Sequence, residues 1–328
     1  MTFYKTDKFS FILRGLRGYI VLVAALLRCA LCGFYNMIIA FISDLHVDIS
    51  SESFKLIDHI NEKLLSLEPD VFIIAGDIAA NSKTFETTLN KFSTVSCNKF
   101  LVAGNHDIWI DSPSSLQRGI HSGVKYNEII PQICKRNDFI YLGLEPHSID
   151  GIGFAGTIGW YDYTLRNKKY DSRFSIETYR NKQYRGKITW SDLNFAHWMN
   201  GSNNKRKSDE EVAQEMEASL QNQIKSLSHQ VIDKIVVATH HVPFREMLIY
   251  PNRLPFDFFS AFMGSEGLGN IILEESTVTH VICGHSHIKS SLNIENVQAM
   301  KSPLGYPREW RTKNPDKLID EKLSYFEI

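Results

Sequence analysis

The chain has little cysteine, and the few cysteines it has are scattered. Its 328 residues include an odd number of them, Cys29, Cys32, Cys97, Cys134 and Cys283. A disulfide framework is therefore not expected, and the thiols are predicted to be reduced, as in a cytoplasmic protein. The Cys29-x-x-Cys32 pair has no second pair and no histidine at zinc spacing, so it is not interpreted as a metal site.

An excess of charge of one sign is also absent. Lysine and arginine number 36 and aspartate and glutamate 37, which gives a formal net charge of −1. No global field therefore attracts nucleic acid or an anionic membrane, and nucleic acid is not expected as a partner. A hydrophobic content of 43% and a charged content of 22% are ordinary for a folded soluble protein.

The first 36 residues contain no apolar run long enough to span a bilayer. Tyr19 to Leu27 is apolar, but Arg28 interrupts the run. Three interpretations stay open for residues 1–36: a weak anchor that contacts a membrane, an uncleaved signal segment, or a non-native extension before a true start at Met37. We favour the last, and we predict a single domain over residues 37–328.

Buried strands and amphipathic helices alternate along this domain. Solid apolar runs predict strands at 37–42, 71–75, 100–103, 139–142, 152–156, 235–238 and 281–283, with a hairpin over 290–300. Apolar residues at helical spacing predict helices at 52–67, 210–227 and 269–275, the first capped by Ser50 or Ser51. Residues 160–204 have no clean period and are predicted to be a lid-like insertion. The alternation indicates an α/β fold.

Five short blocks of polar residues follow strands of this pattern. In chain order they are Asp44-Leu45-His46, Gly76-Asp77, Gly104-Asn105-His106-Asp107, Thr239-His240-His241 and Gly284-His285-Ser286-His287. Because the carboxyl ends of parallel strands meet at one edge of a sheet, we expect these side chains to converge there. Carboxylate, amide and imidazole without thiolate suit two catalytic divalent ions rather than a closed zinc site.

The residue types indicate which side chains bind the ions. Asp77 is placed to bridge them, and His240 is preferred to its neighbour His241 because it follows the strand more directly. Gly76, Gly104 and Gly284 each precede a ligand, where a side chain would crowd the site or the turn requires a positive φ. The predicted ligands are Asp44, His46, Asp77, Asn105, His240, His285 and His287.

The order of these blocks resembles the calcineurin-like metallophosphoesterase superfamily, from Met37 to about Glu309. Residues 156–160 and 302–309 resemble motifs of a bacterial branch. The resemblance implies a two-sheet αββα sandwich with a dinuclear metal site at the carboxyl ends of its strands. It assigns Asp44, His46, Asp77 and His287 to one ion, and Asp77, Asn105, His240 and His285 to the other.

The resemblance also implies a reaction. A hydroxide that bridges the two ions would attack phosphorus in line, and the expected substrate is a small-molecule phosphate mono- or diester. His106 would act as the catalytic histidine, with Asp107 or a nearby carboxylate orienting it. Arg245, Arg308 and His241 are candidate substrate-binding residues. The ligand types do not choose between Mn, Fe, Zn and Ni.

Two other functions are weighed against hydrolysis of a small phosphoester. The first is a non-catalytic metal-binding scaffold that recruits a protein partner, but such a scaffold has no need of His106. The second is a nuclease, which predicts a basic cleft that the near-neutral composition does not favour.

Overall fold

The computed structural model describes residues 36–110, 112–201 and 205–328. Residues 1–35, which include Cys29 and Cys32, lie outside the described part. The three interpretations of residues 1–36 as a membrane anchor, a signal segment or an extension therefore concern residues outside it, apart from Asn36. Contacts within the chain define one large unit, Ile39–Phe326. No helix of the described part is both long and apolar enough to cross a membrane.

The first sheet contains the strands predicted at the start of the domain. Its order is β15-β1-β2-β3-β4, and the pairs β1–β2, β2–β3 and β3–β4 are parallel. The strands are β1 Ile38–Ile42, β2 Val71–Ala75, β3 Asn98–Val102, β4 Phe139–Tyr141 and β15 Ser324–Glu327. All five residues of β2 are buried, as expected for a strand covered on both faces.

The second sheet has parallel strands in the middle and antiparallel strands at both edges. Its order is β13-β14-β12-β11-β6-β5, and the pairs β13–β14 and β5–β6 are antiparallel. The strands are β5 His147–Ile149, β6 Ile152–Thr157, β11 Lys234–Thr239, β12 Val278–Cys283, β13 Ser290–Ile294 and β14 Val297–Lys301. The hairpin predicted over residues 290–300 is thereby confirmed.

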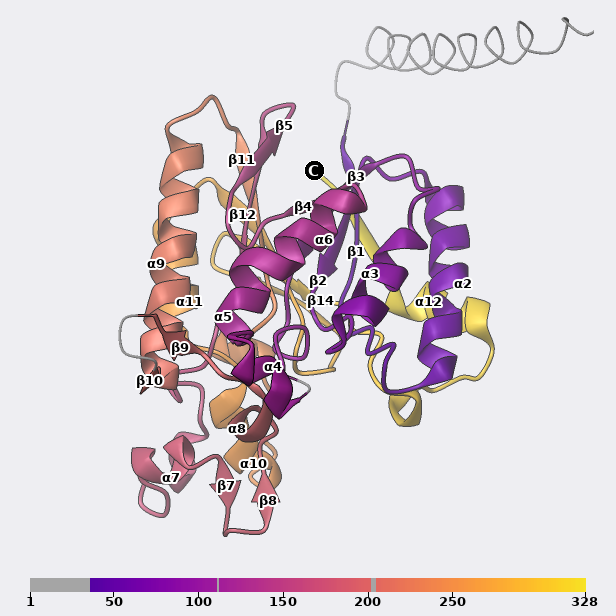
Figure 1. Cartoon of the computed structure of the whole chain (residues 1–328). Coiled ribbons are helices and arrows are strands. Elements are labelled where there is room, and N and C mark those ends of the chain that lie inside the picture. Colours follow the sequence, from indigo (N-terminus) through magenta and orange to yellow (C-terminus); the bar gives the residue numbers. More distant parts are fainter. Residues whose placement is uncertain (1–35, 111, 202–204) are drawn as a thin grey trace, which may run out of the picture. The chain divides into compact units, whose positions relative to one another are not determined.

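The two sheets face each other and helices cover their outer faces (Figure 1). The rings of Phe100 on β3 and Phe154 on β6 meet between the sheets, with centroids 4.7 Å apart. The helices that pack outside are α2 Ser51–Leu67, α3 Ser82–Asn90, α6 Ile130–Arg136, α9 Asp209–Ser228, α11 Glu266–Glu274 and α12 Pro315–Lys322. The predicted two-sheet αββα sandwich is therefore confirmed.

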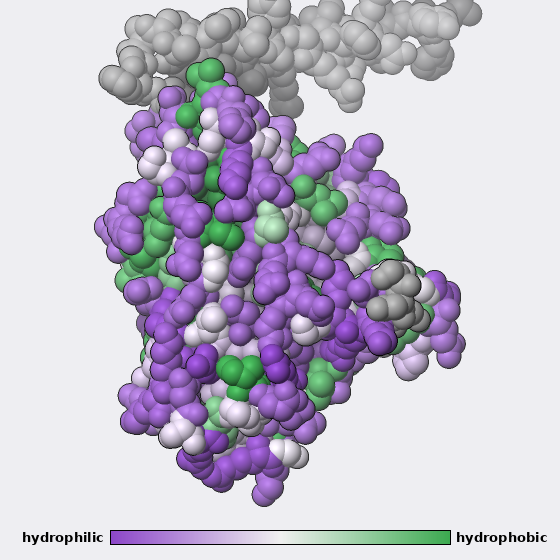
Figure 2. Space-filling model, turned by 90° about the vertical axis from the view of Figure 1, so that its left-hand side faces the viewer, coloured by the Kyte–Doolittle hydropathy of each residue, from purple (hydrophilic) through white to green (hydrophobic). Residues whose placement is uncertain are grey.

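The two long helices follow the predicted stripes. The hydroxyl of Ser50 accepts from the backbone N–H of Glu52 and caps α2, and Ser208 with Glu211 forms a capping box at the start of α9. Figure 2 shows a largely hydrophilic surface on the side of the molecule where α9 lies, as expected of a helix with one buried stripe. Helices α3 and α12 were not predicted, because they are short and mostly polar.

The segment 160–204 is a series of short elements anchored in the core. They are η2 Lys168–Tyr170, α7 Ile176–Arg180, β7 Gln183–Tyr184, β8 Ile188–Thr189, α8 Asp192–Phe195 and β9 Met199–Asn200. Trp160, Tyr161 and Tyr163 are buried, and Lys182 pairs with Asp209 at the start of α9, with Nζ 2.6 Å from Oδ2. The segment shows no regular spacing of apolar residues because its aromatic side chains are buried one by one from short irregular elements, not from one face of a helix or strand.

Candidate metal centre and active site

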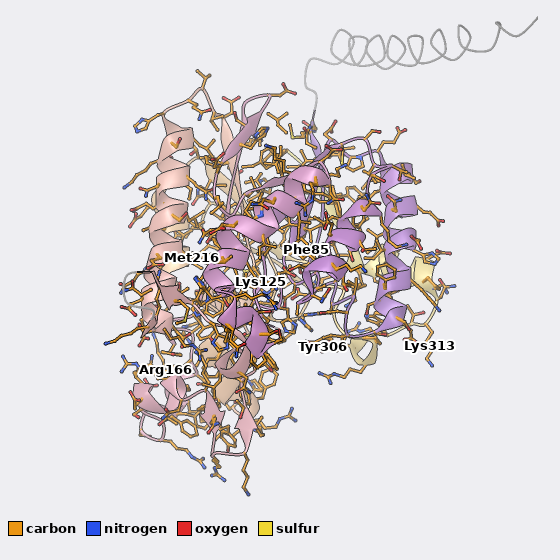
Figure 3. All side chains as sticks on the ribbon, in the orientation of Figure 1. Phe85, Lys125, Arg166, Met216, Tyr306 and Lys313 are labelled. Carbon is orange, nitrogen blue, oxygen red and sulfur yellow. The ribbon has the colours of Figure 1, made fainter. Side chains whose placement is uncertain are left out.

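The predicted ligands lie at the carboxyl ends of five strands. Asp44 and His46 follow β1, Asp77 follows β2, Asn105 follows β3, His240 follows β11, and His285 and His287 follow β12. Hydrogen bonds join these ends: Asp44 N donates to Gly76 O at 2.9 Å in the first sheet, Gly284 N donates to His240 O at 3.0 Å in the second, and His285 N donates to Asp44 Oδ1 at 2.9 Å between the sheets. Figure 3 labels Tyr306 at this edge, where its ring lies 4.6 Å from that of His46.

The backbone is strained where it turns toward the site. Asp44, His46, Asp77, His285 and His287 have φ values of 55°, 45°, 59°, 69° and 53°, a region that residues other than glycine seldom adopt. Such strain persists only where the surrounding structure imposes it, and it gathers at functional sites. The five residues are all predicted ligands.

Two of the glycines leave room for the ligands. Gly76 has a φ of 82°, and a Cβ there would lie 2.6 Å from Nδ1 of His240 and 2.6 Å from Gly104 N. A Cβ on Gly104 would collide with the carboxylate of Asp77. The predicted need for glycine before the ligands is confirmed at both positions.

An inner cluster (Asn105, His240 and His285) forms around Nε2 of His240. This atom lies 3.2 Å from Asn105 Oδ1, 3.2 Å from His285 Nδ1 and 3.4 Å from Asp77 Oδ2. Asp77, His240 and His285 are close enough to hold one ion. His240 and His285 are 0% and 8% exposed, so this cluster is deeply buried, although Asn105 and His285 line a pocket.

An outer cluster (Asp44, His46 and His287) lies beside it. Nε2 of His287 is 2.9 Å from Nε2 of His46 and 3.4 Å from Oδ1 of Asp44. The side chain of His287 is 15% exposed, so this cluster reaches solvent. Asp77 lies between the clusters, because its Oδ2 is also 3.6 Å from Nε2 of His46.

Three imidazoles are fixed by hydrogen bonds on the nitrogen that faces away from the site. Nδ1 of His240 donates to Ala75 O at 2.9 Å, and Nε2 of His285 donates to Phe262 O at 3.1 Å. Nδ1 of His287 donates to the Glu309 carboxylate at 2.9 Å. In its neutral form, each imidazole keeps a lone pair on the other nitrogen, directed at the cluster, as a metal ligand requires.

Carboxylates set the charge of the two clusters. Burial lowers the pKa of His240, but the facing Asp77 carboxylate outweighs it and raises that pKa to about 9. Burial likewise opposes the Asp44 carboxylate at His287, whose pKa rises to about 10. Burial prevails at His46 and lowers its pKa to about 3. In the metal-free protein at neutral pH, one imidazole of each cluster is therefore cationic.

His106 lies beside the shared carboxylate and next to His46 of the outer cluster, with ring centroids 4.6 Å apart, and these two histidines with Asp77 are also close enough to hold an ion. Its Nε2 is 3.9 Å from Asp77 Oδ2, and its backbone N–H donates to Asp77 Oδ1 at 2.9 Å. The ring stacks on Trp109 with centroids 3.6 Å apart. Burial lowers the pKa of His106, and the Asp77 carboxylate opposes this effect. The ring lines the pocket, where it can reach a bound molecule.

Asp107 bonds to the loop after β2. Its carboxylate accepts backbone N–H groups of Asp77, Ile78, Ala79 and Gly104 at 2.7–2.9 Å. These bonds fix the loop after β2, which carries Asp77. The predicted catalytic role of Asp107 stays a prediction; the contacts observed hold the loop that carries Asp77.

The predicted substrate-binding residues are in three different situations. Arg308 lines the pocket, with its guanidinium 4.9 Å from the ring of Tyr306. Arg245 lies away from the described pocket lining and donates to the Glu266 carboxylate at 2.8 Å, which corrects its prediction as a phosphate clamp.

His241 is buried behind the site. Nδ1 of His241 donates to Ile158 O at 3.0 Å, and its ring centroid is 4.3 Å from that of His285. It is absent from the described residues that line the pocket, so contact with a substrate is not supported. The geometry instead places His240, rather than its neighbour, against Asp77.

Asp192 on α8 was missed by sequence reasoning. Its buried carboxylate accepts from Asn105 Nδ2 at 2.9 Å and from the indole N–H groups of Trp109 at 2.6 Å and Trp190 at 2.8 Å. These bonds turn the amide oxygen of Asn105 toward His240 and hold the ring that stacks on His106. No motif marks this residue. Glu309, the partner of His287, stands in a motif that suggested the family but not this contact.

A pocket of about 410 Å³ opens beside the two clusters, within the usual size range of small-molecule sites. Asp77, Asn105, His106, His285 and His287 line one side of it. The remaining lining is largely apolar and comes from Trp109, Trp190, Leu248, Ile249, Phe256, Phe259, Met263 and Ile288, together with Ser191, Ser260, Ser286, Tyr306, Arg308 and Glu309.

Fold and site together define a two-sheet αββα protein with candidate metal-binding clusters at the strand ends. Comparison with known families agrees: the calcineurin-like phosphoesterase family matches residues 37–289. The chain belongs to this family of phosphoric ester hydrolases.

Individual relatives are distant. The DNA double-strand break repair protein Mre11 of Nanoarchaeum equitans (strain Kin4-M) is 26% identical over 151 residues, which cover 40% of this chain and 38% of the relative. The match thus spans well under half of that protein's length. The phosphopantetheinyl hydrolase PptH of Mycobacterium tuberculosis has a similar fold, with a TM-score of 0.67, 18% identity, and coverage of 89% of this chain and 96% of that one. A dimetal phosphatase from Danio rerio gives a TM-score of 0.47 at 14% identity, over 81% of this chain and 86% of that one.

Proposed function

We propose that this protein hydrolyses small phosphate mono- or diesters with two divalent metal ions. One observation carries the proposal: a single buried carboxylate oxygen, Asp77 Oδ2, lies 3.6 Å from Nε2 of His46 and 3.4 Å from Nε2 of His240. An oxygen placed between two ligand clusters is what a bridging carboxylate of a dinuclear site requires.

The side chains present fit such a pair of ions. The outer ion would be held by Asp44, His46, His287 and Asp77, and the inner ion by Asn105, His240, His285 and Asp77. All are nitrogen or oxygen donors, and the described clusters contain no cysteine, which suits Mn, Fe, Zn or Ni in a catalytic site. Two ions bound there would lower the pKa of a bound water to make a nucleophile and would stabilise charge on the phosphoryl oxygens.

The residues around the clusters supply the remaining chemistry. His240 is fixed by a hydrogen bond to a backbone carbonyl, whereas His106 stacks on Trp109 and lines the pocket. We assign it the proton that goes to the leaving oxygen as the phosphorus–oxygen bond breaks. During this step Asp107 would hold the backbone of Asp77 in position, and Asp192 would hold the amide of Asn105.

A small ester suits the pocket better than nucleic acid. One matched relative is named for DNA repair. Phosphate backbones, however, are bound by several lysines and arginines, and Arg308 is the only such residue among the described residues that line the pocket.

Turnover of a chromogenic phosphodiester and monoester with added Mn²⁺, beside an Asp77→Asn control, tests the proposal. We expect metal-dependent hydrolysis of at least one ester by the unsubstituted protein and its loss in the variant. Metal binding without turnover of either ester would instead support the non-catalytic scaffold. The position of His106 at the pocket argues against that alternative.

A further inference from the structure

The pocket beside the candidate metal centre has two chemically different sides. The candidate ligands and His106 form a polar side that suits a phosphoryl group. A second group of lining residues, here called the apolar wall, consists of Leu248, Ile249, Phe256, Phe259 and Met263. These side chains offer no hydrogen-bonding group to a phosphoryl group, so the wall is available to the organic part of a substrate.

One segment of the chain supplies the apolar wall. It contains η3 Arg245–Met247, α10 Phe256–Phe259 and η4 Ser260–Phe262. Phe258 and Phe262 are fully buried, whereas Ile249 and Phe256 are 54% and 46% exposed. The segment thus divides its apolar side chains between the core and the pocket. Phe262 O also accepts the hydrogen bond of His285, so the wall is tied to a candidate ligand.

Two tryptophans extend this apolar surface toward the candidate metal ligands. Trp109 stacks on His106, and the ring of Trp190 lies 5.8 Å from that of His285. Both indole N–H groups donate to Asp192. Because an indole has no other donor, these rings have no N–H left for the pocket and offer it only carbon.

Several polar groups of the pocket are already bonded within the protein. Ser260 Oγ donates to Asp257 O at 2.7 Å, Ser286 Oγ accepts from Lys301 Nζ at 2.7 Å, and the Glu309 carboxylate accepts from His287. Among the pocket's described lining residues, Arg308 is the single lysine or arginine, and it already lies over the ring of Tyr306. Sugars and polyols lose affinity in a site that does not satisfy their hydroxyl groups, since each desolvated hydroxyl without a partner is costly.

We propose that the pocket selects phosphoesters whose organic group is apolar, an alkyl chain or an aromatic ring that rests against Trp109, Trp190 and the apolar wall. This inference rests on the proposed function and specifies its substrate class. It predicts that the phosphoryl group lies at the clusters while the organic group gains affinity from burial of its carbon surface.

Organic phosphonates test the inference, because their phosphorus–carbon bond is not hydrolysed and their organic group is varied freely. We would measure the inhibition constants of methyl-, butyl-, benzyl- and 2,3-dihydroxypropylphosphonate against the chromogenic ester, with Mn²⁺ present. Each buried methylene is worth about fourfold in affinity. We expect butyl- and benzylphosphonate to bind at least tenfold more tightly than the methyl compound, and the dihydroxypropyl compound to bind no better than the methyl one.

Substitutions locate the effect. Phe256→Ser and Ile249→Ser change half-exposed side chains and should each reduce the preference for butyl over methyl at least threefold. Leu65→Ser, at a 48% exposed position on α2, is the matched control and should leave the preference unchanged. Equal inhibition by all four compounds, or preference for the dihydroxypropyl one, overturns the inference while turnover of the ester upholds the proposed function. Absence of any turnover overturns the proposed function and the inference with it.

Discussion

The inner and outer clusters use similar ligands in different surroundings. Around the inner cluster, the ligands are held by backbone carbonyls and by Asp192, and the side chains are almost fully buried. The outer cluster reaches solvent at His287, which is held by the partly exposed Glu309. Ligand type is readable from a sequence, but the surroundings that decide how tightly each ion is held are not. We expect the inner ion to be bound more tightly.

Removal of one imidazole from each cluster should give the largest effects. In His240→Ala the lost ligand lies in a closed site where water does not readily replace it, so we expect loss of the inner ion and a fall in kcat/KM on the order of 10³-fold, since an ion supplies several kcal/mol. In His287→Ala water can enter, and the fall should be at least tenfold smaller. Metal content by elemental analysis and ester kinetics would measure both.

Equal losses in these two variants would break the comparison between the clusters. Leu65→Ser, whose side chain lies on the surface of α2, serves as the control for handling and purification.

Substitution of His106 should separate catalysis from metal binding. His106→Asn removes the proposed proton donor, so kcat should fall by roughly 10²- to 10⁴-fold while both ions remain. The loss should be smaller for a nitrophenyl ester than for an alkyl ester, because nitrophenolate leaves without a proton. A decrease in metal content would show instead that His106 is a ligand beside Asp77, from which its Nε2 is 3.9 Å distant.

Asp192 and Glu309 form a matched pair of supporting carboxylates, one for each cluster. Asp192→Asn would replace one of the two carboxylate oxygens by an NH2 group where three N–H donors now meet, so at least one of Asn105 and the two indoles would lose its acceptor. We expect a 10- to 100-fold loss of inner-ion affinity or kcat. Glu309→Gln keeps a hydrogen bond to His287 and should cost about tenfold, at the outer ion only. Titration of each variant with Mn²⁺ would check this, and an inner-ion defect in Glu309→Gln would contradict it.

The predictable part of this molecule is the part with a periodic or local signal. Buried strands appear as apolar runs, and a ligand directly after such a run, as Asp44 after β1 or Asp77 after β2, lies at the sheet edge whatever surrounds it. For this reason the fold, the family and the convergence of the candidate ligands followed from residue order alone.

The remaining part depends on contacts between residues far apart in the chain. Asp192 reaches Asn105 across 87 positions, and Arg245 is occupied by Glu266 rather than free for a phosphate. Asp107 stands next to His106 in sequence, yet its carboxylate faces the loop after β2. The identity of a residue does not show which residue its side chain bonds to, so these three roles could be assigned only from the structure.

The pH dependence of metal uptake provides a finer test of the two clusters. His240 and His287 have pKa values of about 9 and about 10 in the metal-free protein, raised by Asp77 and Asp44 against the effect of burial. A histidine binds a metal only as neutral imidazole, so each ion displaces one proton at pH 7, and its affinity should rise about tenfold per pH unit. The rise should end near pH 9 for the inner ion and continue toward pH 10 for the outer one.

Glu309→Gln removes part of the charge that raises the pKa of His287. In this variant the affinity for the outer ion should stop rising at a lower pH, while the pH dependence of the inner ion stays unchanged. Calorimetry in buffers of different ionisation enthalpy would count the released protons, and uptake without proton release at pH 7 would contradict the cationic state of both imidazoles.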